Sequence, residues 1–312
     1  MPNRFGGSPY KAQLNEYLAK TEEYYQPSTR KERERKFYLV ARTMIEQGAP
    51  ANVLKWTRAD ILRWKKHIDK MVQSSTSVKY WRCLGELLDY YKNDCLRDML
   101  RDREIRLPKV PPKEIKSLRP KEVQEIREAV KDMEGWEGDV ARFLTVFYPY
   151  TGLRPSELRT EKLSDIDLDT WTLVVSHPKG AESYGRKRTI PILEPARQPL
   201  LDFLEARKRY ILSLGHDPRT DILIPCKHWR TLGIWPDARW RALKSMIQKR
   251  TSVRFTWQIF RSTFCQWAID EGAALSAVSK IMGHTTTMTT ELHYGRIKDY
   301  KAIEEVNRLF SS

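Results

Sequence analysis

The chain has 312 residues, of which 40% are hydrophobic and 10 are Trp, and it carries a formal net charge of +16. This composition supports a folded core in one large or two ordinary domains and excludes a globally disordered chain. No apolar run is long enough to span a bilayer, and the amino-terminal stretch lacks an apolar signal segment, so we expect a cytoplasmic protein. The excess positive charge favours a polyanionic partner, nucleic acid in particular.

The first third of the chain has the periodicity of helices. In STRKERERKFYLVARTMIEQG, residues 28–48, four apolar residues recur at helical spacing: Phe37, Val40, Ala41 and Met44. Thr57, with Asp60 three residues later, resembles a capping box at the start of another helix. Between Ser77 and Leu100, one side of the helical pattern carries Trp81, Leu84, Leu88 and Tyr91. Residues 10–104 therefore predict four or five helices, in which basic residues outnumber acidic ones.

A proline-rich segment follows, IRLPKVPPKEIKSL at 105–118. Its prolines remove backbone donors and disfavour helix, so this segment predicts an extended linker between domains 1–104 and 119–312.

After the linker, helices surround one hairpin. Residues 119–133 and 138–153 predict two helices, the second running into a turn. TWTLVVSH at 170–177 and RKRTIPI at 186–192 predict two strands joined by a turn-rich loop. Residues 194–214 return to helix, and the remainder is mostly helical with loops at 215–235. The predicted fold is mainly α with a small antiparallel β-sheet.

Five residues in this second region have side chains suited to phosphate chemistry. Arg154 lies in TGLRPSEL with Glu157 three residues later, Lys179 lies in the hairpin loop, and Arg261 lies in WQIFRSTF. His284 and Tyr294 lie in GHTTTMTTELHYGR. Each alone is ordinary, because such residues are most often solvated or packed.

Taken in order, these residues resemble the tyrosine recombinase or phage-type integrase family, with Xer-like and archaeal integrases the most similar. The family order is a TGxRxxEL arginine, a hairpin lysine, an HxxR box, a histidine and then a tyrosine. The resemblance covers residues of about 119–312. It implies a two-domain C-shaped clamp, made of an amino-terminal helical core-DNA-binding domain and a catalytic domain with a carboxy-terminal exchange tail.

The resemblance also implies a role for each residue. Arg154 and Arg261 would hold the non-bridging oxygens of the scissile phosphate, since two guanidinium forks bind such oxygens bidentately. Lys179 would protonate the departing 5′-oxygen, His284 would donate a hydrogen bond, and Tyr294 would attack the phosphorus. The family acts as a homotetramer on double-stranded DNA. We expect no cofactor, no metal and no ATP, and a nucleoid-associated protein in the cytoplasm.

Two positions depart from the family pattern. Gln258 stands where the family most often has His, and an amide can donate a hydrogen bond but cannot shuttle a proton at neutral pH. A Gln258→His change is therefore expected to be tolerated. The gap from His284 to the tyrosine is also one residue longer than usual, with His293 at the usual position. We take Tyr294 as the nucleophile, with Tyr300 as the fallback. The Thr-rich stretch between His284 and Tyr294 is a weak helix composition, suited to bringing a phenol into a site made elsewhere.

Further DNA contacts are expected from basic residues on two elements. Arg186, Lys187 and Arg188 lie on the second predicted strand, where they either contact the DNA backbone or form only a charged face. Lys79 and Arg82 lie on one predicted helix. The tail has an apolar helical stripe made of Ile297, Ala302, Ile303, Val306, Leu309 and Phe310. It either packs on its own domain or docks on a neighbouring protomer.

Three other functions are weighed against a recombinase. They are a catalytically inactive DNA-binding or architectural relative, a type IB topoisomerase, and a basic RNA-binding protein. The last accounts for the charge but not for the ordered Arg, Lys, Arg, His and Tyr.

Overall fold

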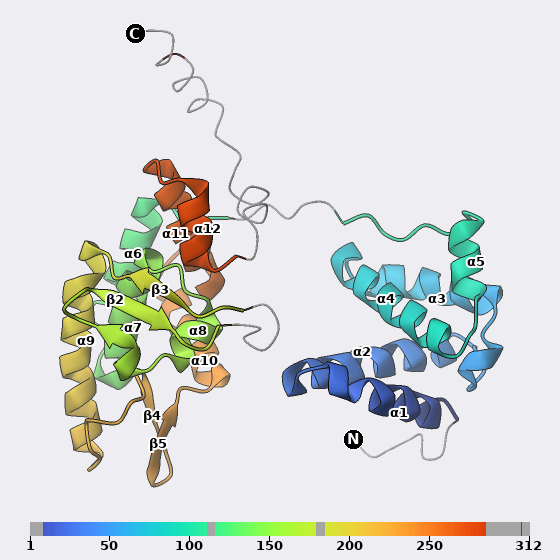
Figure 1. Cartoon of the computed structure of the whole chain (residues 1–312), viewed down its shortest axis with the longest axis horizontal. Coiled ribbons are helices and arrows are strands. Elements are labelled where there is room, and N and C mark those ends of the chain that lie inside the picture. The colour runs from blue at the N-terminus through green and yellow to red at the C-terminus, as the bar shows by residue number, and fades with distance from the viewer. Residues whose placement is uncertain (1–8, 111–115, 179–184, 285–306, 308–312) are drawn as a thin grey trace. The chain divides into compact units, whose positions relative to one another are not determined.

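The computed structural model describes residues 9–110, 116–178, 185–284 and 307, and divides the chain into two compact units, Met1–Lys113 and Glu114–Ser312 (Figure 1). The division falls inside the segment predicted as a linker. Each unit has its own hydrophobic core. The C-shaped clamp stays a prediction. None of the described helices is both long and apolar enough to cross a bilayer.

The amino-terminal unit is helical throughout its described part. Its elements are α1 (Pro9–Thr21), η1 (Glu22–Tyr24), α2 (Pro27–Glu46), η2 (Val53–Lys55), α3 (Arg58–Met71), α4 (Ser74–Tyr90) and α5 (Cys95–Arg101). The apolar face predicted for α2 is confirmed, since all four of its predicted residues are buried. The capping box of α3 is also confirmed: the backbone N–H of Thr57 donates to Asp60 Oδ2 at 2.8 Å, and Thr57 Oγ1 accepts from the backbone N–H of Asp60 at 3.4 Å.

The carboxy-terminal unit holds the remaining elements. Its helices are α6 (Pro120–Val130), α7 (Gly135–Phe147), η3 (Tyr148–Tyr150), α8 (Pro155–Thr160), η4 (Leu163–Asp165), α9 (Glu194–Ser213), α10 (Asp237–Gln248), α11 (Trp257–Asp270) and α12 (Leu275–Met282). Its strands are β1 (Ile166–Asp167), β2 (Thr172–Val175), β3 (Arg188–Pro191), β4 (Pro225–His228) and β5 (Thr231–Ile234). The tail lies outside the described residues, apart from Asn307.

The described residues of this unit form two antiparallel sheets. The first has the order β1-β2-β3, with Leu173 opposite Ile190, and it confirms the predicted hairpin. The second is the β4–β5 hairpin, with Cys226 opposite Gly233. It lies within residues 215–235, which the sequence predicted as loops, so that prediction is wrong there. The sequence signal is weak because PCKH has no alternation of apolar and polar residues and each strand has only four residues.

The core brings the turn before α8 against α11 and α12. α7 packs along α9 (Figure 1), and the rings of Phe143 and Phe203 stack with centroids 4.1 Å apart. α11 lies against η3, which continues α7, and also packs on α12. Phe264 and Met282 belong to a small buried cluster of these two helices. Residues 151–154 therefore sit where the ends of several elements meet.

Candidate functional site

Arg154 and Glu157 are brought together by the short helix that follows the TGLR turn. Pro155 is the first residue of α8, where a missing N–H costs nothing, and Arg154 is the N-cap. The Glu157 carboxylate turns back on this end of the helix. It accepts the backbone N–H of Arg154 at 2.8 Å and Arg154 Nη1 at 2.7 Å. The arginine side chain stays 22% exposed, so one edge of its guanidinium remains open.

A second arginine reaches the same carboxylate from the sheet. Arg188, at the start of β3, donates through Nη2 to Glu157 Oε2 at 2.8 Å and through Nη1 to Oε1 at 3.2 Å. Its Nε donates to the carbonyl of Ile281 at 2.7 Å. Burial opposes the ionised carboxylate, but the hydrogen bonds and charge of Arg188 and the hydrogen bond from Arg154 outweigh it. They lower the pKa of Glu157 to about 2.

The third arginine lies behind the other two. Arg261, on α11, is 2% exposed. Its Nη1 donates to the carbonyl of Gly152 at 2.5 Å and its Nη2 to that of Met282 at 2.6 Å. Burial, followed by the positive charge of Arg154, lowers the pKa of Arg261 to about 10, so it stays charged at neutral pH. Each terminal nitrogen carries two hydrogens, so donors remain after these bonds are made.

Two glycines make this approach possible. Gly152 has φ +64°, and a Cβ there would meet the ring of Phe264 at 2.5 Å. Gly283 ends α12 in the left-handed conformation, φ +66°, and a Cβ there would lie 2.9 Å from the guanidinium of Arg188. The carbonyl of Gly283 accepts Arg154 Nη2 at 3.2 Å. A side chain at residue 152 would force Phe264 of α11 to move, and one at residue 283 would force Arg188 to move.

The charges of this cluster do not cancel. Three guanidinium groups surround one carboxylate, so three positive charges less one negative leave a surplus of two among these four side chains. Burial strengthens the field of such a surplus. The arrangement suits an anion that accepts several N–H bonds at once, and a phosphate group is the biological anion of that kind.

An open pocket of about 510 Å³ lies beside Arg154, which is the member of the cluster that lines it. It is lined by Arg154, Pro155, Ser156, Arg159, Asp237, Trp240, Arg241, Trp257 and Gln258. Gln258 is in the first turn of α11, three residues before Arg261, so the QxxR spacing places one residue at the rim and the other behind it. Sequence reasoning missed Arg159 and Arg241, whose proximity depends on the fold.

The structure brings together part of the predicted set. Arg154 and Gln258 both line the pocket, whereas Arg261 is buried near Arg154 and does not line it. His284 directly follows Gly283, with its backbone N–H donating to the carbonyl of Ser279 at 3.0 Å. The predicted lysine and tyrosine, Lys179 and Tyr294, and the fallback Tyr300 lie outside the described residues. Lys79 and Arg82 are exposed on α4, in the other unit. Arg186 and Lys187 are exposed just before β3.

Arg188 differs from its expected setting. Its side chain is 8% exposed and all three of its guanidinium nitrogens donate within the protein, which does not favour the DNA contact predicted for it. The signal was present in the strand, because side chains two apart share a face and Ile190 and Ile192 are buried. Arg188 therefore orients Glu157 and the end of α12.

A second buried carboxylate, Glu161, lies four residues after Glu157. It is 2% exposed, and neither of its oxygens accepts a hydrogen bond from a described N–H or hydroxyl group. Burial, reinforced by the negative charge of Asp165, raises the pKa of Glu161 to about 8. At neutral pH this side chain is therefore mostly a neutral acid.

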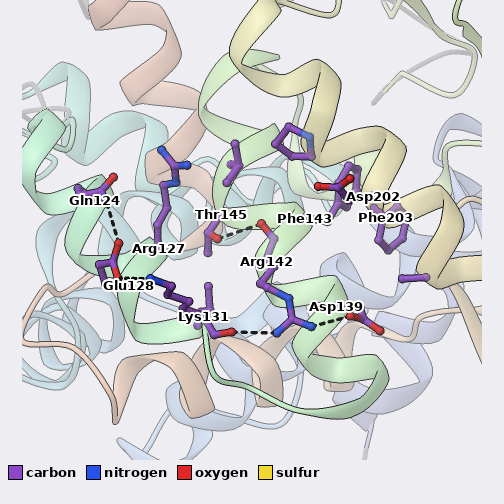
Figure 2. A pocket seen from close by; sticks show the side chains of 14 residues that line it. Gln124, Arg127, Glu128, Lys131, Asp139, Arg142, Phe143, Thr145, Asp202 and Phe203 are labelled. Atoms are coloured by element: carbon purple, nitrogen blue, oxygen red, sulfur yellow. Dashed lines mark hydrogen bonds and ion pairs between the residues drawn. The ribbon is translucent and has the colours of Figure 1, made fainter.

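A further pocket, of about 340 Å³, lies between α6, α7 and α9 (Figure 2). Its charged walls are largely paired, with Arg142 Nη2 2.5 Å from Asp139 Oδ1 and Lys131 Nζ 3.8 Å from Glu128 Oε2. None of the predicted site residues lines it, and we assign no chemistry to it. Within the described residues, no group of three His, Cys, Asp or Glu side chains is arranged to hold a metal. All four cysteines are free, and all but Cys95 are buried.

Comparison with known sequences matches residues 116–300 to the phage integrase family. The chain is similar to the tyrosine recombinase XerA of Pyrococcus furiosus, with 27% identity covering 81% of this chain and 80% of the relative. It is also similar to the tyrosine recombinase XerC of Anoxybacillus flavithermus, with 24% identity covering 78% of each chain.

Two solved structures share the fold. One is the XerH site-specific recombinase bound to a palindromic difH substrate, with a TM-score of 0.69, 14% identity and 99% of each chain covered. The other is the Tn1549 transposon integrase in complex with a circular intermediate DNA, with a TM-score of 0.66 and 18% identity, covering 95% of this chain and 99% of that one. The family match spans more than half of the chain. The β2–β3 hairpin and the turn that carries Arg154 lie inside the matched residues. The chain therefore belongs to the phage integrase family of tyrosine recombinases.

Proposed function

We propose that the protein is a site-specific DNA recombinase or integrase that cuts and rejoins DNA through a covalent 3′-phosphotyrosine, without ATP. The observation that carries this proposal is the arginine cluster: three guanidinium groups around Glu157 with a surplus of two positive charges beside an open pocket. The transition state of phosphoryl transfer gathers negative charge on the non-bridging oxygens. Fixed cations at that point supply the stabilisation such a reaction needs.

The proposed cleavage and rejoining need no external energy source. The phenolic oxygen of Tyr294 attacks the scissile phosphorus and its proton passes to water, while the bond from phosphorus to the 5′-oxygen breaks. Lys179 gives that 5′-oxygen a proton and regains one from water. One phosphodiester replaces another of similar energy, so the free 5′-hydroxyl of a partner strand can reverse the step. Repeating the exchange on paired duplexes passes through a Holliday junction, for which we propose a tetramer.

Each described residue has a part in this scheme. Arg154 presents its open edge to a phosphate in the pocket, and Arg261 contributes its remaining N–H donors from behind. Gln258 at the rim offers an amide N–H to the same group. Glu157 keeps the guanidinium groups in place and, because its pKa is about 2, it takes no proton at neutral pH.

Trapping of the covalent adduct tests the proposal. The full chain is incubated with a library of nicked duplexes of randomised sequence, in which cleavage beside the nick releases a short fragment and blocks religation. We expect a covalent complex whose attachment site, read by mass spectrometry, is Tyr294. The Tyr294→Phe variant is expected to form none, Tyr300→Phe is expected to form it normally, and Arg154→Ala is expected to slow it by about 100-fold or more.

The same experiment separates the alternatives. DNA binding without any adduct would overturn the proposal in favour of a catalytically inactive DNA-binding relative. An adduct that survives in Tyr294→Phe and disappears in Tyr300→Phe would move the nucleophile to the fallback position.

A further inference from the structure

A tryptophan stands in solvent at the tip of the β4–β5 hairpin. Trp229 is 87% exposed, more than any other exposed large hydrophobic side chain in the described residues. Its neighbours Lys227, His228 and Arg230 are exposed as well. Figure 1 shows the hairpin extending from the carboxy-terminal unit, with its turn beyond the neighbouring helices. The tip thus presents one aromatic ring among basic side chains.

The turn itself does not explain a tryptophan. Trp229 and Arg230 form a two-residue turn between His228 and Thr231, and Trp229 has φ 55°, in the left-handed region. Glycine and asparagine are the residues that such a position favours, and a bulky side chain there costs about 1 kcal/mol. The ring contributes little to the core, because most of its surface faces water. An interaction with a binding partner is therefore the remaining physical reason for a tryptophan at residue 229.

The base of the hairpin is held firmly. The carbonyl of Pro225 accepts hydrogen bonds from two buried indoles, Trp136 Nε1 and Trp235 Nε1, each at 2.9 Å. Trp235 follows β5 directly and is fully buried. The hairpin therefore presents its tip from a fixed base, which lowers the entropy lost when the ring binds a partner.

The hairpin also leads directly into the wall of the pocket that Arg154 lines. Only Trp235 and Pro236 separate β5 from α10. The first residues of α10, among them Asp237 and Arg241, line the pocket together with Arg154. Asp237 is paired with Arg241 at 3.1 Å, so the acidic residue at this junction is neutralised while Lys227 and Arg230 remain at the tip. The positive charge at the hairpin tip and in the pocket wall is complementary to a polyanion that extends past the pocket.

We propose that the hairpin tip is an aromatic anchor for duplex DNA, outside the pocket where cleavage takes place. Trp229 packs its ring against a base edge or deoxyribose in a groove, and Lys227 and Arg230 contact the flanking phosphates. This inference rests on the proposed function, since it takes DNA as the ligand. It adds a binding site whose contribution is apolar as well as electrostatic.

Salt dependence separates the two contributions. The full chain is titrated with a fluorescently labelled duplex of random sequence over a series of NaCl concentrations. Trp229→Asn keeps a residue suited to the left-handed turn and is expected to weaken binding by about 10-fold at every salt concentration, with an unchanged slope. The double variant Lys227→Gln, Arg230→Gln is expected to reduce the slope of log affinity against log salt by about 2.

Two controls make the result specific. Trp229→Phe keeps an aromatic ring and is expected to bind within about 3-fold of the wild type. Leu212→Ala removes another exposed apolar side chain, near the end of α9, and is expected to change nothing. Binding by Trp229→Asn within about 2-fold of the wild type would overturn the inference. So would a change in self-association of that variant, measured by sedimentation, with DNA affinity intact.

The two proposals fail in different ways. A wild-type chain that binds DNA through Trp229 but forms no tyrosine adduct overturns the proposed function alone. A wild-type chain that forms the adduct while Trp229→Asn binds normally overturns the hairpin inference alone.

Discussion

Two buried carboxylates near α8 have opposite properties. Glu157 and Glu161 lie four residues apart, and neither is more than 2% exposed. The carboxylate of Glu157 accepts hydrogen bonds from Arg154 and Arg188, and its pKa falls to about 2. Glu161 faces the negative charge of Asp165, and its pKa rises to about 8. Equal burial therefore gives opposite charge states, because the neighbouring charges decide which form is stable.

The difference shows that neighbouring side chains determine whether a buried carboxyl group of this domain is ionised. At Glu157 the fold gathers around one anion the N-cap arginine of α8 and Arg188 of β3, which lies 31 residues after Glu157. At Glu161 the fold leaves a buried carboxyl group to which no described cation is hydrogen-bonded, and its neutral, protonated form is the stable one. Burial alone does not distinguish the two acids, whereas their hydrogen-bond partners place only Glu157 in the arginine cluster.

Removing Glu157 is expected to have the largest effect. Glu157→Ala leaves Arg154, Arg188 and Arg261 close together without their anion, and we expect a loss of about 3–5 kcal/mol in the free energy of unfolding. Urea unfolding of the full chain measures it. Glu161→Ala is the matched control, for which we expect a change under about 1 kcal/mol, since the cavity cost is offset by removal of an unpaired acid. Equal losses in the two variants would remove the distinction between the sites.

Replacing Arg188 tests how the cation cluster is held. Arg188→Lys cannot reproduce the two hydrogen bonds to Glu157, so we expect a loss of about 2 kcal/mol in the free energy of unfolding. Since lysine keeps the positive charge, the salt slope of DNA binding is measured with Arg188→Gln, and we expect that slope to be unchanged because the Arg188 side chain is occupied inside the protein. Arg186→Gln is the comparison, and it is expected to leave stability alone and reduce the slope by about 1. A reduced slope for Arg188→Gln would restore the DNA contact predicted from the sequence.

Changing Glu161 to an amide is expected to have a smaller, pH-dependent effect. The folded pKa of about 8 exceeds the ordinary value of 4.5, so stability contributed by the neutral acid is complete below pH 4.5 and is lost as pH rises towards 8. Glu161→Gln removes this loss. We expect the variant to match the wild type at pH 4 and to exceed it by on the order of 2 kcal/mol at pH 8. A stability difference that stays constant across this range would contradict the high pKa of Glu161.

Much of the fold could be predicted because its signals are local. The cap of α3 needs only Thr57 and Asp60, and the buried face of α2 follows from the spacing of four apolar residues. The β4–β5 hairpin escaped prediction because its stability comes from distant groups. The carbonyl of Pro225 is bound by Trp136, 89 residues away in sequence, and nothing within the strands indicates that contact.

The site was predictable as a set of residue types but not as a network. The order of Arg154, Gln258, Arg261 and His284 identified the family, and the structure brings those residues to one place. The strand alternation places Arg188 on the same face as the buried Ile190 and Ile192, but its partner Glu157 lies 31 residues earlier and could not be identified from the sequence. The roles of Lys179 and Tyr294 stay predictions.

The arginines of the site also hold the end of α12. Arg188, Arg261 and Arg154 donate, in that order, to the carbonyls of Ile281, Met282 and Gly283, the last backbone acceptors before His284. An anion that draws these N–H groups towards itself weakens the attachment of that helix end. By thermodynamic reciprocity, whatever displaces the helix end must change the affinity for the anion by the same factor. Occupancy of the pocket and the position of the end of α12 are thus coupled by the same free energy.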